Sequence, residues 1–212
     1  ATGRIQEAPI VKEMLLGSAH NRYLFKYTTQ SINYVECHDN LTFFDKCLAM
    51  TDDLELIRKQ EKLATAMVIL AQGVPFIHSG QEFYRTKDQD ENSYQSGDLV
   101  NRIDWQRSDL YQDDIEFIKA LISIRRHNDA FKYKASSELD QYVEVISLQS
   151  HSILYHVNNS EDFLIVFKPT MDKETLIIPE DYRFYLSSSN QFQMLDSQTY
   201  ELSDIGTFLF KK

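Results

Sequence analysis

The sequence predicts a two-part fold, an α/β unit in residues 1–130 followed by a small all-β unit in residues 131–212. Short apolar runs that end abruptly in polar residues, together with helix-length periodic stretches, predict the α/β unit. Beyond about Phe131, short strand-like runs separated by polar turns predict the all-β unit. A chain of 212 residues, 42% of them hydrophobic, is long enough to bury a sizeable core.

Charge and cysteine content exclude several kinds of partner and site. The formal net charge of −10 disfavours nucleic acid or an anionic membrane, because either partner requires a concentrated basic face. A neutral ligand fits better. Cys37 and Cys47 lack the paired spacing of a zinc site and give no disulfide framework, so we expect two reduced thiols. We expect neither a metal nor a cofactor.

We expect neither a membrane helix nor a signal peptide in this sequence. No stretch approaches the roughly 18 apolar residues of a membrane helix. The first residues, ATGRIQEAP, contain neither Met nor the apolar core of a signal peptide, and they resemble the middle of a longer protein. This start favours a cytoplasmic location over secretion but leaves the location open.

The first part of the chain begins with a short helix after Pro9, ended by Gly17. An apolar run of strand length follows, at Ile32, Tyr34 and Val35. It turns into the polar sequence ECHDN and then into charged, helix-like sequence. A strand that is buried on both faces and presents His, Asp and Asn at its carboxyl end is typical of a (β/α) barrel, whose catalytic groups lie at the strand tips.

His38 and Asp39 are therefore candidate site residues. A second interpretation is equally compatible with the pattern, since a strand-end Asp commonly caps the following helix, and His38 could then simply pack beside it.

A long helix and a second strand complete a βαβ unit. Asp52, with Glu55 three positions on, predicts the helix start, and Leu56, Leu63, Met67 and Leu70 share one helical face to about Ala71. Gly73 ends the helix, and residues 74–77 form a short buried strand that ends in His78. A strand, helix, strand order of this length predicts two parallel strands covered by helices.

A loop of about 27 residues, 81–107, has no convincing period, and loops of this length are usually functional or disordered. Its aromatic residues argue against disorder. A further helix is predicted from a cap at Ser108 or Asp109, with Leu110, Phe117, Leu121 and Ile124 on one face and basic residues 125–127 at its end. The order resembles the last quarter of a barrel. Because such a barrel is cut open, we expect Leu63, Met67, Leu121 and Ile124 to remain partly exposed.

Seven strand-like runs at about ten-residue spacing predict a small antiparallel sandwich in the second part. They are Tyr142–Leu148, Ile153–Val157, Phe163–Phe167, Thr175–Ile178, Tyr182–Leu186, Phe192–Leu195 and Thr207–Phe210.

Three motifs carry a family resemblance. YVECHDN at 34–40, GVPFIHSGQEF at 73–83 and NSYQSGDLVNRIDW at 92–105 resemble the final barrel strands of the α-amylase superfamily of glycoside hydrolases. Within it, HDN followed by LTFFDK, and QEF followed by YRTK and ENSY, are most similar to type I pullulanases, which hydrolyse α-1,6 bonds. The resemblance is close over residues 9–128 and general beyond them.

The resemblance implies a retaining mechanism, in which one carboxylate attacks the anomeric carbon and another protonates the leaving oxygen. By motif match, Asp39 is the third carboxylate, which stabilises the transition state, and His38 is its hydrogen-bonding neighbour. No sequence here resembles the motifs of the family's nucleophile and acid, so we expect both on earlier strands. Glu36 is expected below the strand tip, and Glu82 behind the site.

The long loop supplies the candidates for sugar binding that the resemblance implies. Asp98, with Arg102 and Asn101, is expected to hydrogen-bond a second sugar, Tyr94 to stack on a sugar face, and Arg85 to orient site carboxylates. For each of them, anchoring of the loop is an alternative role. A calcium loop starting at Asp88 is disfavoured because the Gly and terminal Glu of that motif are absent.

Three functional classes remain open. The first is a C-terminal part of a debranching hydrolase acting on an α-glucan such as pullulan, glycogen or branched starch. The second is another member of the superfamily that hydrolyses or transfers α-1,4-glucans. The third is a non-catalytic glucan-binding module formed by the sandwich and its neighbouring helices.

Overall fold

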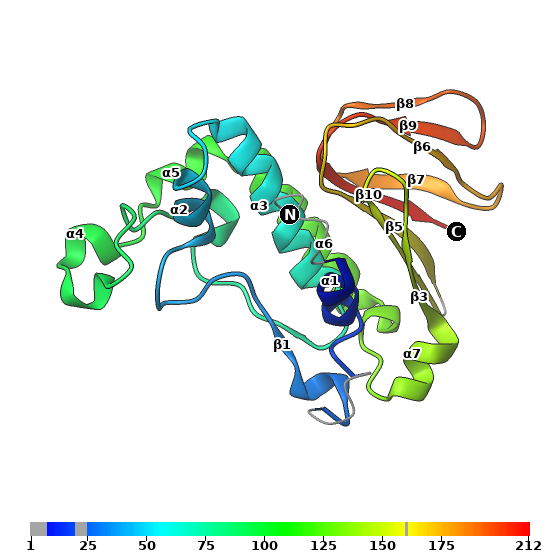
Figure 1. The fold of residues 1–212 in the computed structure, drawn as a ribbon, viewed down its shortest axis with the longest axis horizontal. Coiled ribbons are helices and arrows are strands. Elements are labelled where there is room, and N and C mark those ends of the chain that lie inside the picture. The colour runs from blue at the N-terminus through cyan, green and yellow to red at the C-terminus, as the bar shows by residue number, and fades with distance from the viewer. Residues whose placement is uncertain (1–7, 20–24, 160) are drawn as a thin grey trace.

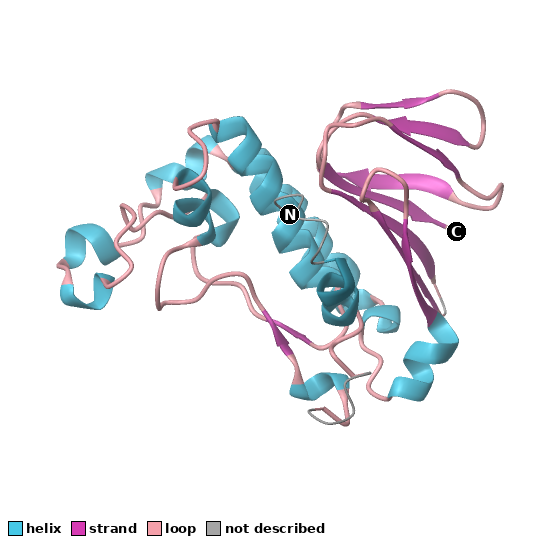
Figure 2. Ribbon diagram, viewed as in Figure 1, coloured by secondary structure: helices cyan, strands magenta, loops and turns pink. Residues whose placement is uncertain are grey.

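The computed structural model describes residues 8–19, 25–159 and 161–212, and the start of the chain discussed above lies outside them. Helices dominate up to Tyr142, and antiparallel sheets form the rest (Figures 1 and 2). The helices are α1 (Ala8–Leu15), α2 (Phe43–Leu48), α3 (Leu54–Leu70), α4 (Asp98–Asn101), α5 (Gln106–Leu110), α6 (Gln112–His127) and α7 (Ser136–Tyr142), with 3-10 turns η2 (Thr28–Gln30), η3 (Gln81–Phe83), η4 (Ser93–Gln95) and η5 (Asp129–Phe131).

The strands β1 (Ile32–Asn33) and β2 (Val74–Pro75) pair in parallel, and α3 connects them, as the strand, helix, strand order predicts. Each strand has only two residues, fewer than expected. The expectation of burial on both faces is wrong, since Ile32 is 62% exposed and Tyr34 is 55% exposed. Among the described residues, β1 and β2 pair only with each other, and the ring of Tyr34 packs edge-on against that of Phe76.

Helix α3 begins one residue later than predicted, because Asp53 rather than Asp52 accepts a hydrogen bond from the Leu56 amide at 3.1 Å. It ends at Leu70, and Gly73 follows with φ +95°, a left-handed conformation that favours glycine. The predicted cap of the next helix is wrong. Ser108 and Asp109 lie in the separate short helix α5, and α6 begins at Gln112 without a side-chain cap.

Helices α3 and α6 pack on each other between β1 and the C-terminal sheets (Figure 1). Leu63, Met67, Leu121 and Ile124 are all buried, so the expected exposure of these faces is wrong. They share one apolar cluster with residues of α1 and with the inner face of a C-terminal sheet, including Leu15, Tyr155, Phe163, Phe167 and Leu209. The chain therefore covers this helix pair with its own sheet.

The C-terminal part forms two antiparallel sheets from the described residues. Strands β3 (Val143–Ser147), β4 (Ile153–Asn158), β5 (Asp162–Lys168), β10 (Gly206–Lys211) and β7 (Arg183–Ser187) form one sheet in that order, and β6 (Glu174–Ile177), β9 (Thr199–Leu202) and β8 (Phe192–Met194) form the other. A second apolar cluster joins the two sheets, with Val166 and Phe208 from one and Leu176 and Leu202 from the other.

The seven predicted runs correspond to β3–β8 and β10, whereas β9 and α7 were not predicted. Strand β9 is four residues long and alternates half-buried with buried side chains, too short for a clear period. Helix α7 has one buried apolar residue, Leu139, so its sequence lacks an apolar face. Within the described residues, no helix combines the length and apolar character required to cross a membrane.

Candidate active site

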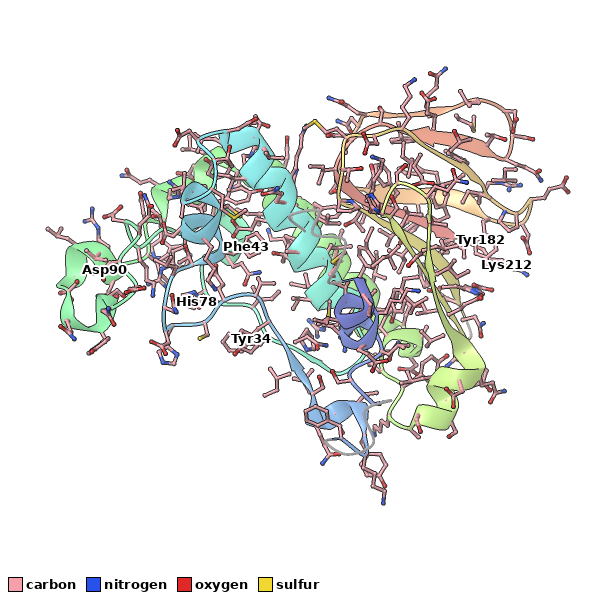
Figure 3. The ribbon with its side chains drawn as sticks, viewed as in Figure 1. Tyr34, Phe43, His78, Asp90, Tyr182 and Lys212 are labelled. Atoms are coloured by element: carbon pink, nitrogen blue, oxygen red, sulfur yellow. The ribbon has the colours of Figure 1, made fainter. Side chains whose placement is uncertain are left out.

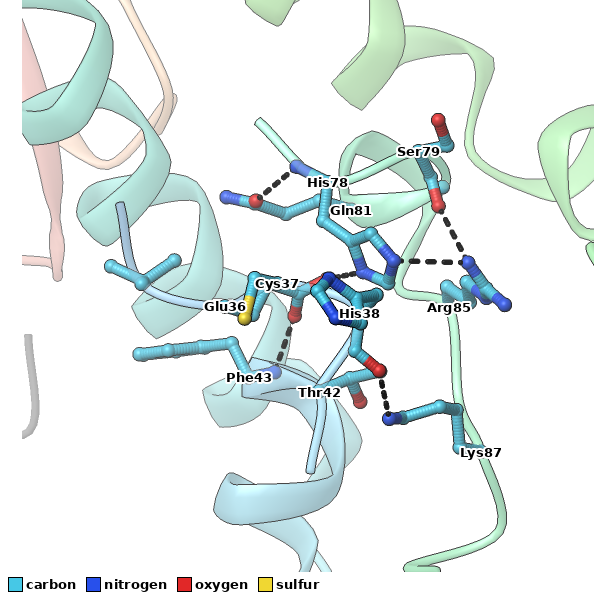
Figure 4. A network of polar contacts seen from close by, with 12 residues as sticks. Glu36, Cys37, His38, Thr42, Phe43, His78, Ser79, Gln81, Arg85 and Lys87 are labelled. Atoms are coloured by element: carbon cyan, nitrogen blue, oxygen red, sulfur yellow. Dashed lines mark hydrogen bonds and ion pairs between the residues drawn. The ribbon is translucent and has the colours of Figure 1, made fainter. Parts of the chain in front are cut away.

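The polar end of the first strand is anchored by a buried carboxylate. Glu36 is 2% exposed, and its Oε1 lies 2.9 Å from Nδ1 of His78, which follows the second strand (Figure 4). Its other oxygen accepts a hydrogen bond from the Phe43 amide at the start of α2. Glu36 thus ties the tips of both strands and the following helix together. Figure 3 shows His78 and Phe43 away from the C-terminal sheets, beside which Tyr182 and Lys212 lie.

A buried lysine fixes the next part of the same backbone. The Nζ atom of Lys87 donates to the carbonyl of His38 at 3.1 Å, and Lys87 itself is buried. Its amide donates to Oδ2 of Asp45 at 2.8 Å, and Thr86 donates to the other oxygen of that carboxylate. The exposed side chains of His38 and Asp39 therefore stand on an anchored backbone.

Asp39 does not cap the following helix. That role belongs to Thr42, whose hydroxyl accepts from the Asp45 amide at 3.1 Å. The Asp39 carboxylate accepts from the adjacent Asn40 amide at 3.1 Å, and Asn40 has a left-handed φ of +62°. The capping interpretation of Asp39 is wrong, and an exposed carboxylate remains that the local fold does not require.

A hollow of about 260 Å³ brings part of the predicted site together. It is lined by His38, Asp39, Asn40, Glu91, Ser93 and Tyr94. The ring of Tyr94 is 76% exposed. A carboxylate, an imidazole and an open aromatic face are groups that can hydrogen-bond sugar hydroxyls and stack on a sugar ring.

The remaining predicted residues lie elsewhere. Arg85 and Arg102 line a second hollow of about 170 Å³, and Asp98 is exposed at the start of α4 and lines neither hollow. The side-chain nitrogen of Asn101, Nδ2, donates to the carbonyls of Ser93 and Ser96 at 2.6 and 3.1 Å, so this side chain links α4 to the loop that precedes it. The sugar-binding roles of Asp98, Asn101 and Arg102 stay predictions.

Arg85 contacts a histidine rather than a site carboxylate. One of its terminal nitrogens, Nη1, lies 3.2 Å from Nε2 of His78, and the other, Nη2, donates to the Asn101 carbonyl at 2.5 Å. Arg85 is thus connected to a carboxylate, that of Glu36, only through His78, and its role in orienting site carboxylates stays a prediction.

Buried acidic groups lie behind the strand tips. Burial raises the pKa of Glu61 well above its ordinary value, and the nearby carboxylate of Glu36 adds to the effect, against the opposing charge of Arg107. Burial and the same Glu61 raise the pKa of the Cys47 thiol to about 11, which keeps it protonated.

No cluster of three or more potential metal ligands occurs among the residues that the structure describes.

The sequence analysis assigned no site role to His78 or Lys87, and it placed Glu36 below the tip of the first strand rather than in the site. A signal for His78 was present, because it follows the second parallel strand directly, at the edge where the first strand presents His38 and Asp39. Lys87 carried no comparable signal, since its contact with His38 spans 49 residues of chain.

Comparison with known proteins gives a consistent result, although no family model matches the chain. It is 37% identical over 198 residues to a pullulanase of Bacillus subtilis, an alignment that covers 88% of this chain and 27% of that relative. It is 32% identical over 146 residues to the chloroplastic pullulanase 1 of Arabidopsis thaliana, covering 62% of this chain and 15% of the relative.

Solved structures agree. The pullulanase of Anoxybacillus sp. LM18-11 complexed with maltotetraose superposes with a TM-score of 0.89 at 32% identity, covering all of this chain and 31% of that one. The type I pullulanase of Bacillus subtilis complexed with maltose gives a TM-score of 0.85 at 33% identity, covering 99% of this chain and 32% of the other. The chain spans about a third or less of the proteins that it matches.

Proposed function

We propose that this chain, a homologue of one part of the pullulanases, contributes to the active site of a debranching glycoside hydrolase that cleaves α-1,6-glucosidic bonds with retention. The observation that carries the proposal is the hollow lined by His38, Asp39 and Tyr94, where the backbone of the His–Asp pair is anchored by buried Glu36 and Lys87.

Asp39 is proposed to stabilise the transition state. Its exposed carboxylate accepts only a neighbouring amide among the contacts described, so it can accept hydrogen bonds from the hydroxyls of a bound sugar. These bonds strengthen as the sugar ring flattens and gains positive charge, which places their effect in the transition state. His38 donates a further hydrogen bond beside it. The nucleophile and the general acid are expected in the part of the protein that this chain does not include.

The fold proposal follows from the same relationship. We propose that β1 and β2 are the last two strands of a (β/α)8 barrel formed by residues 1–130 together with the rest of the protein, and that residues 131–212 form a β-sandwich. The parallel pairing of Ile32 with Val74 supports the first part. The exposure of Ile32, Tyr34 and Phe76 supports it too, because neighbouring strands and helices would cover such side chains.

The proposed substrate is a branched α-glucan. Two of the similar structures are pullulanases complexed with maltotetraose and with maltose, both short glucans. Tyr94 is proposed to stack on a sugar, and Asp98 with Arg102 to bind a sugar further from the bond that is cleaved.

Hydrolysis of pullulan by the intact protein tests the proposal, with linear amylose as the control substrate. We expect release of reducing ends from pullulan and little from amylose. We also expect residues 1–212 alone to release none, since an acid–base pair contributes roughly 10²–10⁴-fold or more in rate. Turnover by residues 1–212 would mean that the catalytic pair lies within this chain, and an intact protein inactive on pullulan would exclude the proposed function.

A further inference from the structure

A line of polar contacts runs from Glu36 through His78 to Arg85 (Figure 4), and from Arg85 it continues to Asn101 in the loop that carries Tyr94. Glu36 follows β1, His78 follows β2, and Arg85 follows η3. Glu36 and His78 lie 2.9 Å apart, and His78 and Arg85 lie 3.2 Å apart. Both Glu36 and His78 are buried, so their contact is sheltered from water, and the contact of His78 with Arg85 is partly buried.

The partners of His78 define its tautomer. A guanidinium can only donate hydrogen bonds, so Nε2 of His78 must accept from Arg85. The proton of the neutral ring then resides on Nδ1, which donates to the carboxylate of Glu36. A doubly protonated ring would turn Nε2–H toward the Arg85 cation. The neutral Nδ1–H form is therefore the one that satisfies both neighbours.

The backbone directs Arg85 toward this histidine. Gly80 has φ +93°, and a Cβ atom there would lie 3.0 Å from Cβ and 3.1 Å from Cδ of Arg85. The Arg85 side chain thus lies across a position where only glycine leaves room. Its other terminal nitrogen donates to the Asn101 carbonyl at 2.5 Å, and the Asn101 side chain holds the Ser93 carbonyl at 2.6 Å. Tyr94 is the next residue.

We propose that His78 is a positioning residue that fixes the strand tip bearing Asp39 relative to the loop bearing Tyr94. The inference rests on the proposed function. His78 is not a lining residue of the hollow between Asp39 and Tyr94, so it acts through its two neighbours. Its Nδ1 side fixes the tip through Glu36, and its Nε2 side fixes the loop through Arg85.

Three variants of the intact protein separate these two sides. In His78→Asn the amide nitrogen replaces Nδ1 and keeps the contact with Glu36, so we expect a raised KM for pullulan and a nearly unchanged kcat. In His78→Gln the amide oxygen replaces Nε2 and keeps the contact with Arg85, so we expect a lowered kcat and a nearly unchanged KM. In His78→Ala both contacts are lost, and kcat/KM should fall about 10–100-fold, as for other residues that orient a site from behind.

His156→Ala is the matched control. His156 is half-buried, whereas His78 is buried, but it too lies against a carboxylate, with its Nε2 2.7 Å from Oδ1 of Asp162, and it belongs to a C-terminal sheet. Its loss should lower Tm without changing kcat or KM. If the His78 variants behave in the same way, His78 is structural and the proposal is overturned.

The ¹⁵N chemical shifts of the His78 ring provide a readout that does not depend on activity. The Nδ1–H tautomer is expected from the two contacts of the ring, and an Nε2–H tautomer would overturn the proposal even if the protein is inactive on pullulan. An inactive wild-type protein with the expected tautomer would instead refute the proposed function and the positioning role that depends on it.

Discussion

The replacement Asp39→Asn separates a catalytic carboxylate from a structural one. It keeps the size of the side chain and removes its charge. The described hydrogen bond of the carboxylate, from the Asn40 amide at 3.1 Å, can still be accepted by the amide oxygen of Asn. The side chain is exposed and caps no helix, so the free energy of unfolding should change by less than about 0.5 kcal/mol.

The activity should change far more. Loss of one preorganised polar group that acts in the transition state lowers kcat by about 10²–10³-fold, or about 2.7–4 kcal/mol. KM should change much less, since the lost interaction belongs mainly to the transition state. Initial rates of reducing-end release from pullulan by the intact protein, combined with thermal melts, measure both effects.

Thr42→Ala is the matched control, three residues further on. Thr42 caps α2, so its loss should cost about 1 kcal/mol of stability and leave kcat nearly unchanged. A nearly wild-type kcat in Asp39→Asn would refute the catalytic assignment of Asp39. A large fall in Tm in that variant would show that the carboxylate supports the fold in a way that its contacts do not reveal.

Three further predictions concern stability and binding. Asp98→Asn should raise KM for pullulan more than it lowers kcat, and equal KM values would remove Asp98 from the substrate site. Arg125→Met should lower the free energy of unfolding by about 3 kcal/mol or more in denaturant melts, because Arg125 donates to the carbonyls of Ile69 in the last turn of α3 and of Ala71 and Gly73 just before β2. The pKa of the Glu61 carboxyl is raised in the folded state, so the folded protein binds the carboxyl proton more tightly than the unfolded protein does. The stability that this proton contributes is therefore full below the ordinary pKa of about 4.5 and is lost as the pH rises above it. Glu61→Gln should therefore raise Tm relative to wild type, by an amount that grows from pH 5 to pH 8, and a constant difference would show that Glu61 is ionised in the fold.

Elements with a strong local pattern could be predicted from the sequence. The long helix α3 was expected to end near Ala71 and ends at Leu70, because the spacing of apolar residues on one helical face and the position of Gly73 are both local signals. The strand pair was placed correctly, but its burial was not. Leu63 and Met67 were expected to be partly exposed because the barrel is cut open. They are buried because the C-terminal sheet, which the prediction did not take into account, covers them.

Within the site, the sequence located exposed groups better than buried ones. His38 and Asp39 follow an apolar run directly, so a local pattern reveals them. The contacts that hold them join residues 42 and 49 positions apart, Glu36 with His78 and His38 with Lys87, and pairing at such separations leaves no local period. The sequence could not show whether Asn101 binds a sugar or anchors the loop. In the structure its side-chain nitrogen donates to carbonyls of the loop.

The distribution of buried charge argues that the strand tips are built for function. Glu36, Asp45 and Lys87 are almost completely buried behind one exposed His–Asp pair, and Glu61, whose raised pKa favours the protonated form, is buried beside them. Burying charge is costly, and well-packed apolar residues of similar volume are often at least as stable. The apolar cluster that joins α3 and α6 to the C-terminal sheet shows that this chain forms such packing elsewhere. A fold selected for stability alone would extend that cluster behind the strand tips. Polar burial there is explained if it serves to hold His38 and Asp39 in one geometry, since sites that need precise placement commonly sacrifice stability for it.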